Sequence, residues 1–314
     1  MKHIPSYPKI MILGSAYTEN ALIGEVIIQE KVDGSQFSFG KNEDGELVCR
    51  SKGQQQDLYA PDKMFTAGVE YVKSLDLSGF EPDTYFYGEY LQKPKHNVLK
   101  YSRIPNNHIV LFDVFNKGMF LSRAPLEVYA KELGLEVVPE LYKGELDRTR
   151  IADAHGGTSS PASDHLKRII MTTESFLGGE TVEGVVIKNY DQKILLGGMI
   201  FPVFTKYVRE SFKERHDTEW KIKRPKDSIE DYIKGFCSEA RWQKAFQYLR
   251  DNSSLEMQAR DIPKLIKRVQ EDITEEEEAN IRETLYNKFI GEIMRHSIKG
   301  LPEWWKNKLL DNVK

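Results

Sequence analysis

The sequence predicts an α+β fold in which a β-rich domain is followed by a small all-α domain. Before residue 220, short apolar runs alternate with turn residues, a pattern typical of strands. After residue 220, apolar residues recur at spacings of three and four, which is typical of helices. A chain of 314 residues is long for one compact domain. We therefore predict one domain over 1–219 and a helical domain over 220–314.

The first domain contains strand-like runs that are separated by turns and helices. The turns at 42–45 and 116–118 carry a glycine suited to positive φ, so we expect hairpins there. We predict one helix starting at Pro61 and another over 122–134. The predicted strands are 26–28, 36–39, 47–49, 85–87, 109–115, 185–187 and 194–204.

In the second domain we predict four helices. The first is capped by Asp227 or Ser228, and the second has an apolar stripe over 262–273. Thr274 and Glu277 form a capping-box pattern, which predicts that a third helix begins there. A last short helix follows Pro302. The Gly- and Ser-rich run 154–163 is expected to be a mobile surface loop of the first domain.

The composition is that of an ordinary globular protein, with 40% hydrophobic and 30% charged residues. Two cysteines, Cys49 and Cys237, exclude a disulfide scaffold and a zinc site built from cysteines, and they favour a reducing, cytoplasmic location. No apolar run of about 18 residues is present, so we expect no membrane span. The first residues do not resemble a signal peptide.

The charge distribution is uneven along the chain. The formal net charge of −3 argues against a general nucleic-acid coat. Residues 206–226, however, hold eight basic and four acidic side chains. This stretch either binds phosphates or is a solvated connector between the two domains, and the charge alone favours neither.

Five segments of the first domain carry charged residues within or beside apolar strands. Such residues are costly to bury unless they are paired or bind a ligand, so five of them together predict one polar cleft. In any single segment, an edge-strand charge is the better explanation, and only the five together favour the cleft. In the third segment, strand alternation predicts Phe112 and Val114 on one face and Asp113 on the other. The segments are EKVDGS at 30–35, YGEY at 87–90, LFDVF at 111–115, EGVVIK at 183–188 and FTKY at 204–207.

These segments, in this order over 30–208, resemble the nucleotidyltransferase motifs shared by ATP-dependent polynucleotide ligases and mRNA capping enzymes. The resemblance implies an adenylation domain of antiparallel sheets with flanking helices. A short lead before the lysine and a helical end are similar to the T4 RNA ligase 2-like group. DNA ligases and capping enzymes continue instead into a β-rich OB domain, and NAD-dependent ligases carry an extra domain before the lysine.

The resemblance implies an ATP-dependent RNA ligase that acts in RNA repair. Lys31 would attack the α-phosphate of ATP, and the resulting lysyl-bound AMP would pass to an RNA 5′-phosphate before an RNA 3′-OH displaces it. We expect Lys188 and Lys206 to act with Lys31 by lowering its pKa and by offsetting charge on the phosphate. The implied partner is RNA with ends bridged by a duplex, bound by a monomer. A virus is a common source of this family.

The resemblance also implies the ligands of ATP and of Mg²⁺ or Mn²⁺. Asp33, Glu89 and Glu183 offer the hard oxygen atoms that such metal ions prefer. Phe112 would stack on adenine, Glu30 would lie at the adenine edge, and Arg50 would contact the ribose or the RNA end unless it is a surface residue. The full set of expected nucleotide contacts is Glu30, Lys31, Arg50, Glu89, Phe112, Glu183, Lys188 and Lys206.

One motif departs from the group's pattern, and one nearby loop is less informative. Val208 occupies the position where the group commonly has a second lysine, so Lys206 acts alone or Arg209 or Lys213 supplies the second charge. His96 lies in a segment that we interpret as a solvated loop.

Two alternatives remain. A DNA ligase or a capping guanylyltransferase would share the motifs, and the helical end argues against both. A non-catalytic RNA-binding nucleotide sensor would not need Lys31. Since the helical region 220–314 carries none of the motifs, we expect its removal to impair RNA sealing more than self-adenylylation.

Overall fold

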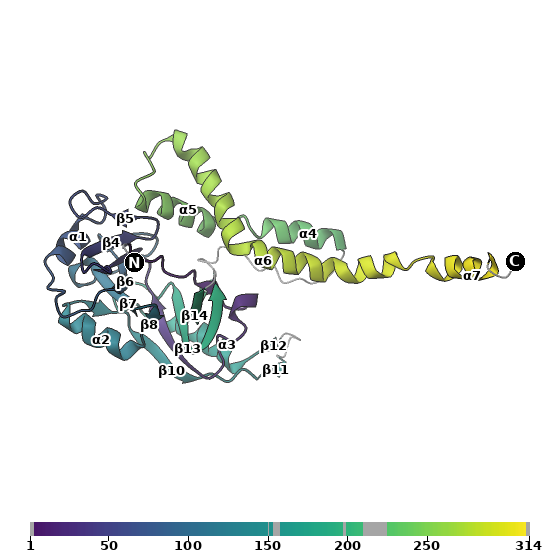
Figure 1. Cartoon of the computed structure of the whole chain (residues 1–314), viewed down its shortest axis with the longest axis horizontal. Coiled ribbons are helices and arrows are strands. Elements are labelled where there is room, and N and C mark those ends of the chain that lie inside the picture. Colours follow the sequence, from purple (N-terminus) through teal and green to yellow (C-terminus); the bar gives the residue numbers. More distant parts are fainter. Residues whose placement is uncertain (1–2, 150, 153–157, 197–198, 210–224, 312–314) are drawn as a thin grey trace. The chain divides into compact units, whose positions relative to one another are not determined.

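The computed structural model describes residues 3–149, 151–152, 158–196, 199–209 and 225–311 of a mixed α+β protein (Figure 1). Its contacts group the chain into two compact units, Met1–Val269 and Gln270–Lys314. The division that the sequence predicts after residue 219 falls outside the described residues, so it stays a prediction. The first unit contains all of the strands together with α1–α5, and α6 begins in it.

One sheet of the first unit has five strands, and it carries Lys31 at the end of β2. Its strands pair in antiparallel fashion, apart from β1 and β14, which are parallel. Val26 and Ile28 of β2 pack with Leu166 of α3 (Pro161–Thr172) in a buried cluster. Because strand side chains alternate, Lys31 lies on the opposite face. The strand order is β1 (Met11–Ile12), β14 (Met199–Val208), β13 (Gly184–Leu196), β2 (Glu25–Lys31) and β10 (Glu140–Glu145).

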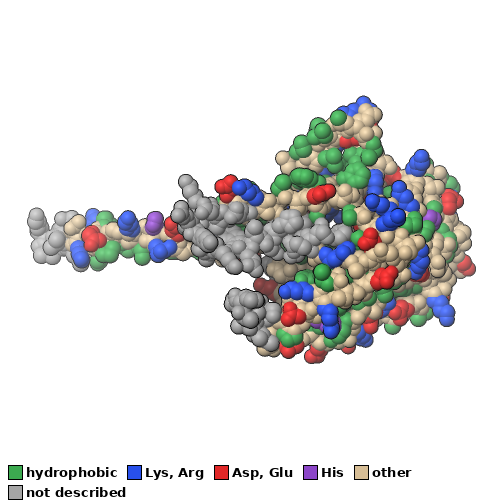
Figure 2. Space-filling model, turned by 180° about the vertical axis from the view of Figure 1, so that it is seen from behind, with side chains coloured by type: hydrophobic (Ala, Val, Ile, Leu, Met, Phe, Trp, Pro, Cys, Tyr) green, Lys and Arg blue, Asp and Glu red, His purple; other side chains and the backbone are tan. Residues whose placement is uncertain are grey.

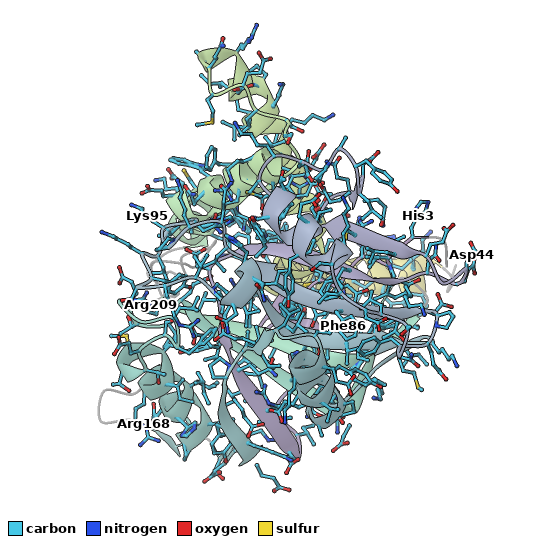
Figure 3. The ribbon with its side chains drawn as sticks, turned by 90° about the vertical axis from the view of Figure 1, so that its left-hand side faces the viewer. His3, Asp44, Phe86, Lys95, Arg168 and Arg209 are labelled. Atoms are coloured by element: carbon cyan, nitrogen blue, oxygen red, sulfur yellow. The ribbon has the colours of Figure 1, made fainter. Side chains whose placement is uncertain are left out.

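The second sheet has seven strands. One of its faces packs against α1 (Thr66–Lys73) and α2 (Arg123–Glu132). Phe37 and Phe86 (Figure 3) are buried there with Val69 of α1 and Leu126 of α2. The predicted hairpins are confirmed, with Gly45 and Gly118 at positive φ. The order is β5 (Gln55–Gln56), β4 (Leu47–Ser51), β3 (Ser35–Lys41), β6 (Thr84–Tyr90), β7 (Ile109–Asn116) and β8 (Met119–Phe120), with β9 (Glu136–Val137) also on β7.

Two predictions about this unit are wrong. Phe112 and Val114 do not share a face, because Tyr87 pairs with Asp113 while the next residue, Gly88, pairs with Leu111. Phe112 is therefore the extra residue of a β-bulge, which reverses the alternation.

The segment 154–163 is also not simply a loop. Its described part forms β12 (Thr158–Ser159), which pairs with β11 (Ile151–Ala152), and then the start of α3. Ser160 caps α3 by accepting a hydrogen bond from the amide of Ser163, which explains why the helix begins there. The strand predicted over 194–204 falls in two strands, β13 and β14.

After residue 224 the described chain is helical, as predicted. Ser238 caps α5, and the expected start of a helix at Thr274 is wrong because α6 runs through it unbroken. The Thr274 hydroxyl donates to the carbonyl of Gln270, one turn back, so it does not act as a cap. The helices are α4 (Pro225–Lys234), α5 (Glu239–Asp251), α6 (Ile262–Ser297) and α7 (Leu301–Asp311), with short 3₁₀ turns at Ala16–Thr18, Asn106–His108 and Ala259–Asp261.

The second unit, taken by itself, exposes several apolar side chains on α6 and α7 (green in Figure 2). They include Leu285, Ile293, Trp304 and Trp305. None of the helices in the described part of the chain is long and apolar enough to span a bilayer.

A buried ion pair joins the two sheets. Lys188 Nζ of β13 lies 2.6 Å from Asp113 Oδ2 of β7, and both side chains are only 1% exposed. The same ammonium donates to the carbonyl oxygen of Phe112 at 2.5 Å. Removing one partner of such a pair leaves an uncompensated charge in a water-free setting, so we expect the pair to fix how the sheets face each other.

This pair yields a stability prediction. Lys188→Met or Asp113→Asn alone should lower the free energy of unfolding by about 3–5 kcal/mol, because each leaves the other group buried without its counter-charge. The double variant should lose clearly less than the sum of the two. Urea denaturation measures all three.

The control is Lys73→Met. Lys73 forms a pair with Glu70 in which the side chains are 31% and 59% exposed, and its loss should cost less than about 1 kcal/mol. If the losses in free energy of unfolding from Lys188→Met and Asp113→Asn simply add in the double variant, the two side chains do not stabilise each other, which would contradict the pair as a link between the sheets.

Candidate active site

The site is centred on Lys31, the last residue of β2. Gly184 of β13 pairs with Lys31, and this register places Glu183 at the same end of the sheet. Lys31 Nζ donates to both carboxylate oxygens of Glu183, at 2.7 Å each. Glu183 is 7% exposed, so the ammonium and the carboxylate form a tight, partly desolvated pair.

The electrostatics of Lys31 differ from the prediction. Burial alone would lower its pKa, but the charge of Glu183 and its hydrogen bonds outweigh burial, and the pKa of Lys31 is raised. Glu89 adds to the increase, while Lys206 opposes it. Lys206 thus lowers the pKa of Lys31 as expected, but Glu183 and Glu89 outweigh it, so the net direction is opposite to the one predicted.

Lys188 and Lys206 share the face of Lys31 but differ in distance from it. Lys206 pairs with Val186, two residues along β13 from Gly184, and its charge acts on both Lys31 and Glu183. Lys188 pairs with Ile27, about 13 Å along the strand at 3.3 Å per residue. Lys188 forms the ion pair with Asp113 that joins the sheets. The prediction that Lys188 lies close to Lys31 is therefore wrong.

Glu89 of β6 is close enough to Lys31 and Glu183 for their charges to act on it. Its pKa is raised to about 8, first because it is buried and then through the charge of Glu183, with Lys31 opposing. Its Oε2 atom is buried without a hydrogen-bond partner. A Cβ atom at Gly34 would lie 3.1 Å from this oxygen, so the glycine keeps space beside it. An unsatisfied buried carboxylate oxygen is costly, which indicates that a ligand or cation completes it.

Asp33, which we predicted as a metal ligand, binds backbone amides. Its Oδ2 atom accepts hydrogen bonds from the amides of Val98 and Leu99, both at 2.7 Å, and its own amide donates to the hydroxyl of Tyr101 at 2.8 Å. One carboxylate oxygen is thus committed to holding the turn after Lys31. Among the residues that the structure describes, no three His, Cys, Asp or Glu side chains are placed to hold a metal ion.

Phe112 lies beside the ion pair that joins the two sheets, and its expected stacking on adenine stays a prediction. Its ring packs edge-on against Tyr7 with centroids 5.0 Å apart, and Lys188 Nζ is 5.6 Å from its centroid. The Tyr7 hydroxyl donates to Asp113, and Tyr190 donates to the same carboxylate at 3.2 Å. Nothing in the sequence pattern points to Tyr7, because it lies outside every motif.

Two predicted nucleotide contacts are placed in unexpected surroundings. Glu30 points to the face opposite Lys31, where its oxygens accept from the Ser175 hydroxyl at 2.5 Å and the Phe176 amide at 3.1 Å. The structure therefore does not bring its carboxylate to Lys31. Arg50 lies in register with Ser38 and, through it, with Tyr87, so it faces the same side as Asp113.

Arg50 donates to the Ser6 hydroxyl at 2.7 Å, and burial lowers its pKa. It is therefore held by the segment that leads to Tyr7.

The end of the last motif and the His96 side chain are both buried or held by hydrogen bonds. Val208 is buried at 4% exposure, and Arg209 donates to the hydroxyl of Thr181 at 2.8 Å. Lys213 lies outside the described residues, as does most of the basic stretch. In the segment that we interpret as a solvated loop, Lys93 and Lys95 are exposed but the His96 side chain is buried, at 6% exposure.

His96 is part of a clamp on the turn that follows Lys31. Its Nδ1 accepts from the amide of Gln92 at 3.0 Å, which leaves Nε2, 2.9 Å from the Ser35 hydroxyl, as the protonated nitrogen of the neutral ring. Burial lowers the pKa of His96 to about 3, with the charge of Arg250 adding to the effect. Asn97 donates to the carbonyl of Gly34 at 2.7 Å.

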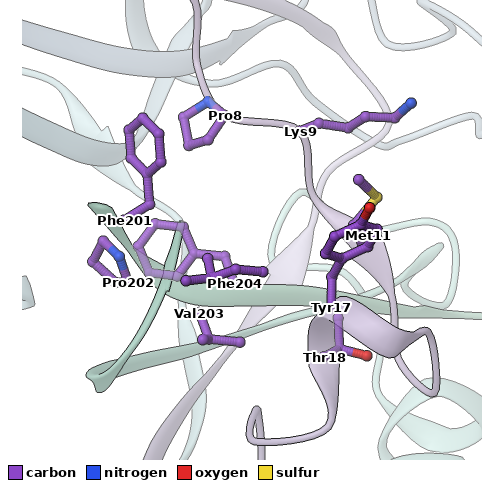
Figure 4. Close-up of a pocket in the computed structure, with 10 residues that line it drawn as sticks. Pro8, Lys9, Met11, Tyr17, Thr18, Phe201, Pro202, Val203 and Phe204 are labelled. Carbon is purple, nitrogen blue, oxygen red and sulfur yellow. The ribbon is translucent and has the colours of Figure 1, made fainter. Parts of the chain in front are cut away.

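A separate small pocket lies beside β14 (Figure 4). Pro8, Lys9, Tyr17, Phe201 and Phe204 line it, together with neighbouring residues. It contains none of the predicted site residues, so it is not part of the group around Lys31.

No curated protein matches the chain. A Naegleria gruberi RNA ligase with PPi matches at a TM-score of 0.46 and 16% identity, over 64% of this chain and 56% of that chain. A mutant of the Naegleria gruberi ligase with ATP and Mn matches at 0.46 and 17%, with the same coverage. An archaeal ATP-dependent RNA ligase matches at 0.43 and 18%, over 85% of this chain and 63% of that one.

This chain thus spans little more than half the length of the Naegleria proteins. The family model described as RNA ligase matches residues 24–208, from the start of β2 to the end of β14. That range holds Lys31, Glu89, Glu183 and Lys206 and makes up more than half of the sequence. The chain belongs to the RNA ligase family.

Proposed function

We propose that this protein is an ATP-dependent RNA ligase that seals 3′-OH and 5′-phosphate ends through AMP bound to Lys31. One observation carries the proposal: Lys31 ends a strand, 2.7 Å from both oxygens of Glu183, beside the charge of Lys206 and the unsatisfied oxygen of Glu89. A lysine beside a carboxylate that can accept its proton and a second ammonium that can bind a phosphate is arranged for nucleophilic attack on a phosphate rather than for a structural role.

The first step requires Lys31 to lose a proton. Its ammonium donates to Glu183, so this carboxylate is the group within reach to take the proton. The Nζ lone pair then bonds to the α-phosphorus of ATP while the bond from that phosphorus to the bridging oxygen breaks and pyrophosphate leaves. Lys206 offsets the negative charge that builds on the α-phosphate.

The donor set fits a divalent cation through two carboxylates, Glu89 and Glu183. Glu89 offers a buried oxygen without a partner, and the charge of Glu183 helps to raise the pKa of Glu89. Mg²⁺ or Mn²⁺ bound here would supply positive charge that neutralises Glu183 and the phosphates. Asp33 contributes less directly, because it holds the turn after Lys31.

In the two later steps, the same charged groups of the protein act on the phosphates of the RNA and of AMP. The 5′-phosphate oxygen of RNA attacks the AMP phosphorus and releases Lys31, and the RNA 3′-OH then displaces AMP to form the phosphodiester. We place the protein in the T4 RNA ligase 2-like group, acting as a cytoplasmic monomer on duplex-bridged RNA ends. A DNA ligase or capping enzyme would differ in polymer or would take GTP in place of ATP.

The first test is Lys31→Ala. The variant should not gain AMP when it is incubated with ATP and Mn²⁺, because the attacking nitrogen is gone, and its melting temperature should stay within a few degrees of wild type. Intact-mass spectrometry measures the adduct, and a parallel incubation with GTP tests nucleotide choice. Lys167→Ala on α3, an exposed lysine away from the site, should become adenylylated normally. An AMP adduct on Lys31→Ala would show that another lysine is the nucleophile.

The second test needs no nucleotide. A carboxyl group whose pKa is raised from 4.5 to about 8 keeps its proton in the folded state while the unfolded chain releases it. The free energy of unfolding should therefore fall as the pH rises between these values, by up to about 1.4 kcal/mol per pH unit from this group. Glu89→Gln should remove that part of the slope.

Chemical denaturation between about pH 5.5 and 7.5 measures the slope, since this range lies between the ordinary and the raised pKa of Glu89. The exposed Glu132→Gln on α2 serves as the control and should retain the wild-type slope. If Glu89→Gln has the same slope as wild type, Glu89 is ionised in the free protein, and the assigned burial of its charge is wrong.

A further inference from the structure

Arg250, near the end of α5, binds the turn that follows Lys31. Its Nη2 donates to Asn97 Oδ1 at 2.8 Å and to the Ser35 hydroxyl at 3.3 Å, and its Nη1 donates to the carbonyl of His96 at 3.1 Å. All of these groups lie in the same compact unit. One guanidinium therefore bridges the start of β3 and the loop after β6.

The acidic neighbour of Arg250 fixes its orientation. Asp251 Oδ1 accepts from Nη2 at 2.7 Å and from Nε at 3.0 Å. Asp251 is 9% exposed, and burial raises its pKa. A planar guanidinium can meet several acceptors in different directions at once, which a lysine ammonium on a flexible stem cannot reproduce.

The groups that Arg250 holds are the groups that hold the turn. Asn97 binds the carbonyl of Gly34, and His96 binds Ser35. The amides of Val98 and Leu99 bind Asp33, two residues after Lys31. The position of the turn over 33–35 therefore depends on the loop over 96–99, and Arg250 ties that loop to α5.

The end of α5 also contacts the hairpin that carries Arg50. The Ser253 hydroxyl donates to Asp62 at 2.8 Å, and Asp62 accepts from Gln54 and Gln56, also at 2.8 Å each. Asn252 approaches Gly53 so closely that a Cβ atom there would lie 2.4 Å from its amide group. Two loops that lead to predicted site residues thus meet the same helix end.

We infer that Arg250 is a positioning residue for the adenylylation of Lys31: it clamps the Asp33–Ser35 turn through His96 and Asn97. The inference rests on the proposed function, since it names what holds the same site in place. It also changes an expectation from the sequence. Deleting 220–314 removes Arg250, so the deletion should impair self-adenylylation and not RNA sealing alone.

The test uses the full chain with Arg250→Ala, Arg250→Lys and Asn97→Ala. Rapid-quench measurement with labelled ATP gives the rate of AMP transfer to Lys31 and its dependence on ATP concentration. Hydrogen exchange followed by mass spectrometry reports the amides of 33–36 and 96–99, whether or not ATP reacts. Arg260→Ala is the matched control, because Arg260 is 63% exposed and pairs with Glu256.

We expect Arg250→Ala to slow AMP transfer at saturating ATP by about tenfold or more, because small displacements at a reacting centre are costly. The KM for ATP should change little, and the amides of both segments should exchange faster. Arg250→Lys should not rescue the rate. Combining Arg250→Ala with Asn97→Ala should cost no more than the worse single variant, because both break the same link. Arg260→Ala should behave as wild type.

Other outcomes overturn the inference. A wild-type exchange pattern in Arg250→Ala contradicts the clamp, whatever the reaction rate, and so does a normal rate with altered exchange. Multiplying losses in the double variant would show that Arg250 and Asn97 act separately. If Arg250→Ala is too unstable to assay, the rate of AMP transfer and the hydrogen exchange of Asn97→Ala and Arg250→Lys test the clamp instead. A wild-type protein that never gains AMP would refute the proposed function, while the exchange data would still test the clamp.

Discussion

The ion pair between Lys188 and Asp113 is the constraint on which the arrangement of the site depends. Both of its side chains are buried, and it joins β13 of one sheet to β7 of the other, while each sheet has its own hydrophobic cluster. A buried charge of this kind tolerates little displacement, because a shift would separate charges in a medium of low polarity. The surfaces that carry Lys31 and Phe112 therefore face each other in a fixed register.

Within that frame, the protein without ligands keeps Lys31 protonated. Glu183 raises its pKa instead of preparing it for attack, and Glu89 keeps a buried oxygen unsatisfied. Under the proposed function, the charge of a bound cation and of a triphosphate would act on both groups at once. The proposal therefore links the reactivity of Lys31 to the binding of the nucleotide.

The sequence predicted the sheets and the helical end, because strand alternation and hydrophobic periodicity determine these features locally. The meeting of Lys31 with Glu183, 152 residues apart in the chain, was expected from the resemblance of their motifs to a known family. It did not predict the bulge at Phe112, which depends on pairing with Tyr87 and Gly88. Nor did it predict Tyr7, His96 or Arg250, whose partners lie far away in the chain. Contacts of that kind leave no periodic pattern, so only the folded chain shows them. The role of Lys188 was misjudged for the same reason, since its partner Asp113 lies on another sheet.

The most direct measurement is to locate the adduct in the wild-type protein. After incubation with ATP and Mn²⁺, digestion and tandem mass spectrometry should find a single AMP, bonded through phosphorus to nitrogen, on the peptide that contains Lys31. Treatment with pyrophosphate should remove it and regenerate ATP. AMP on any other side chain, or a protein that stays unmodified under these conditions, would contradict the account.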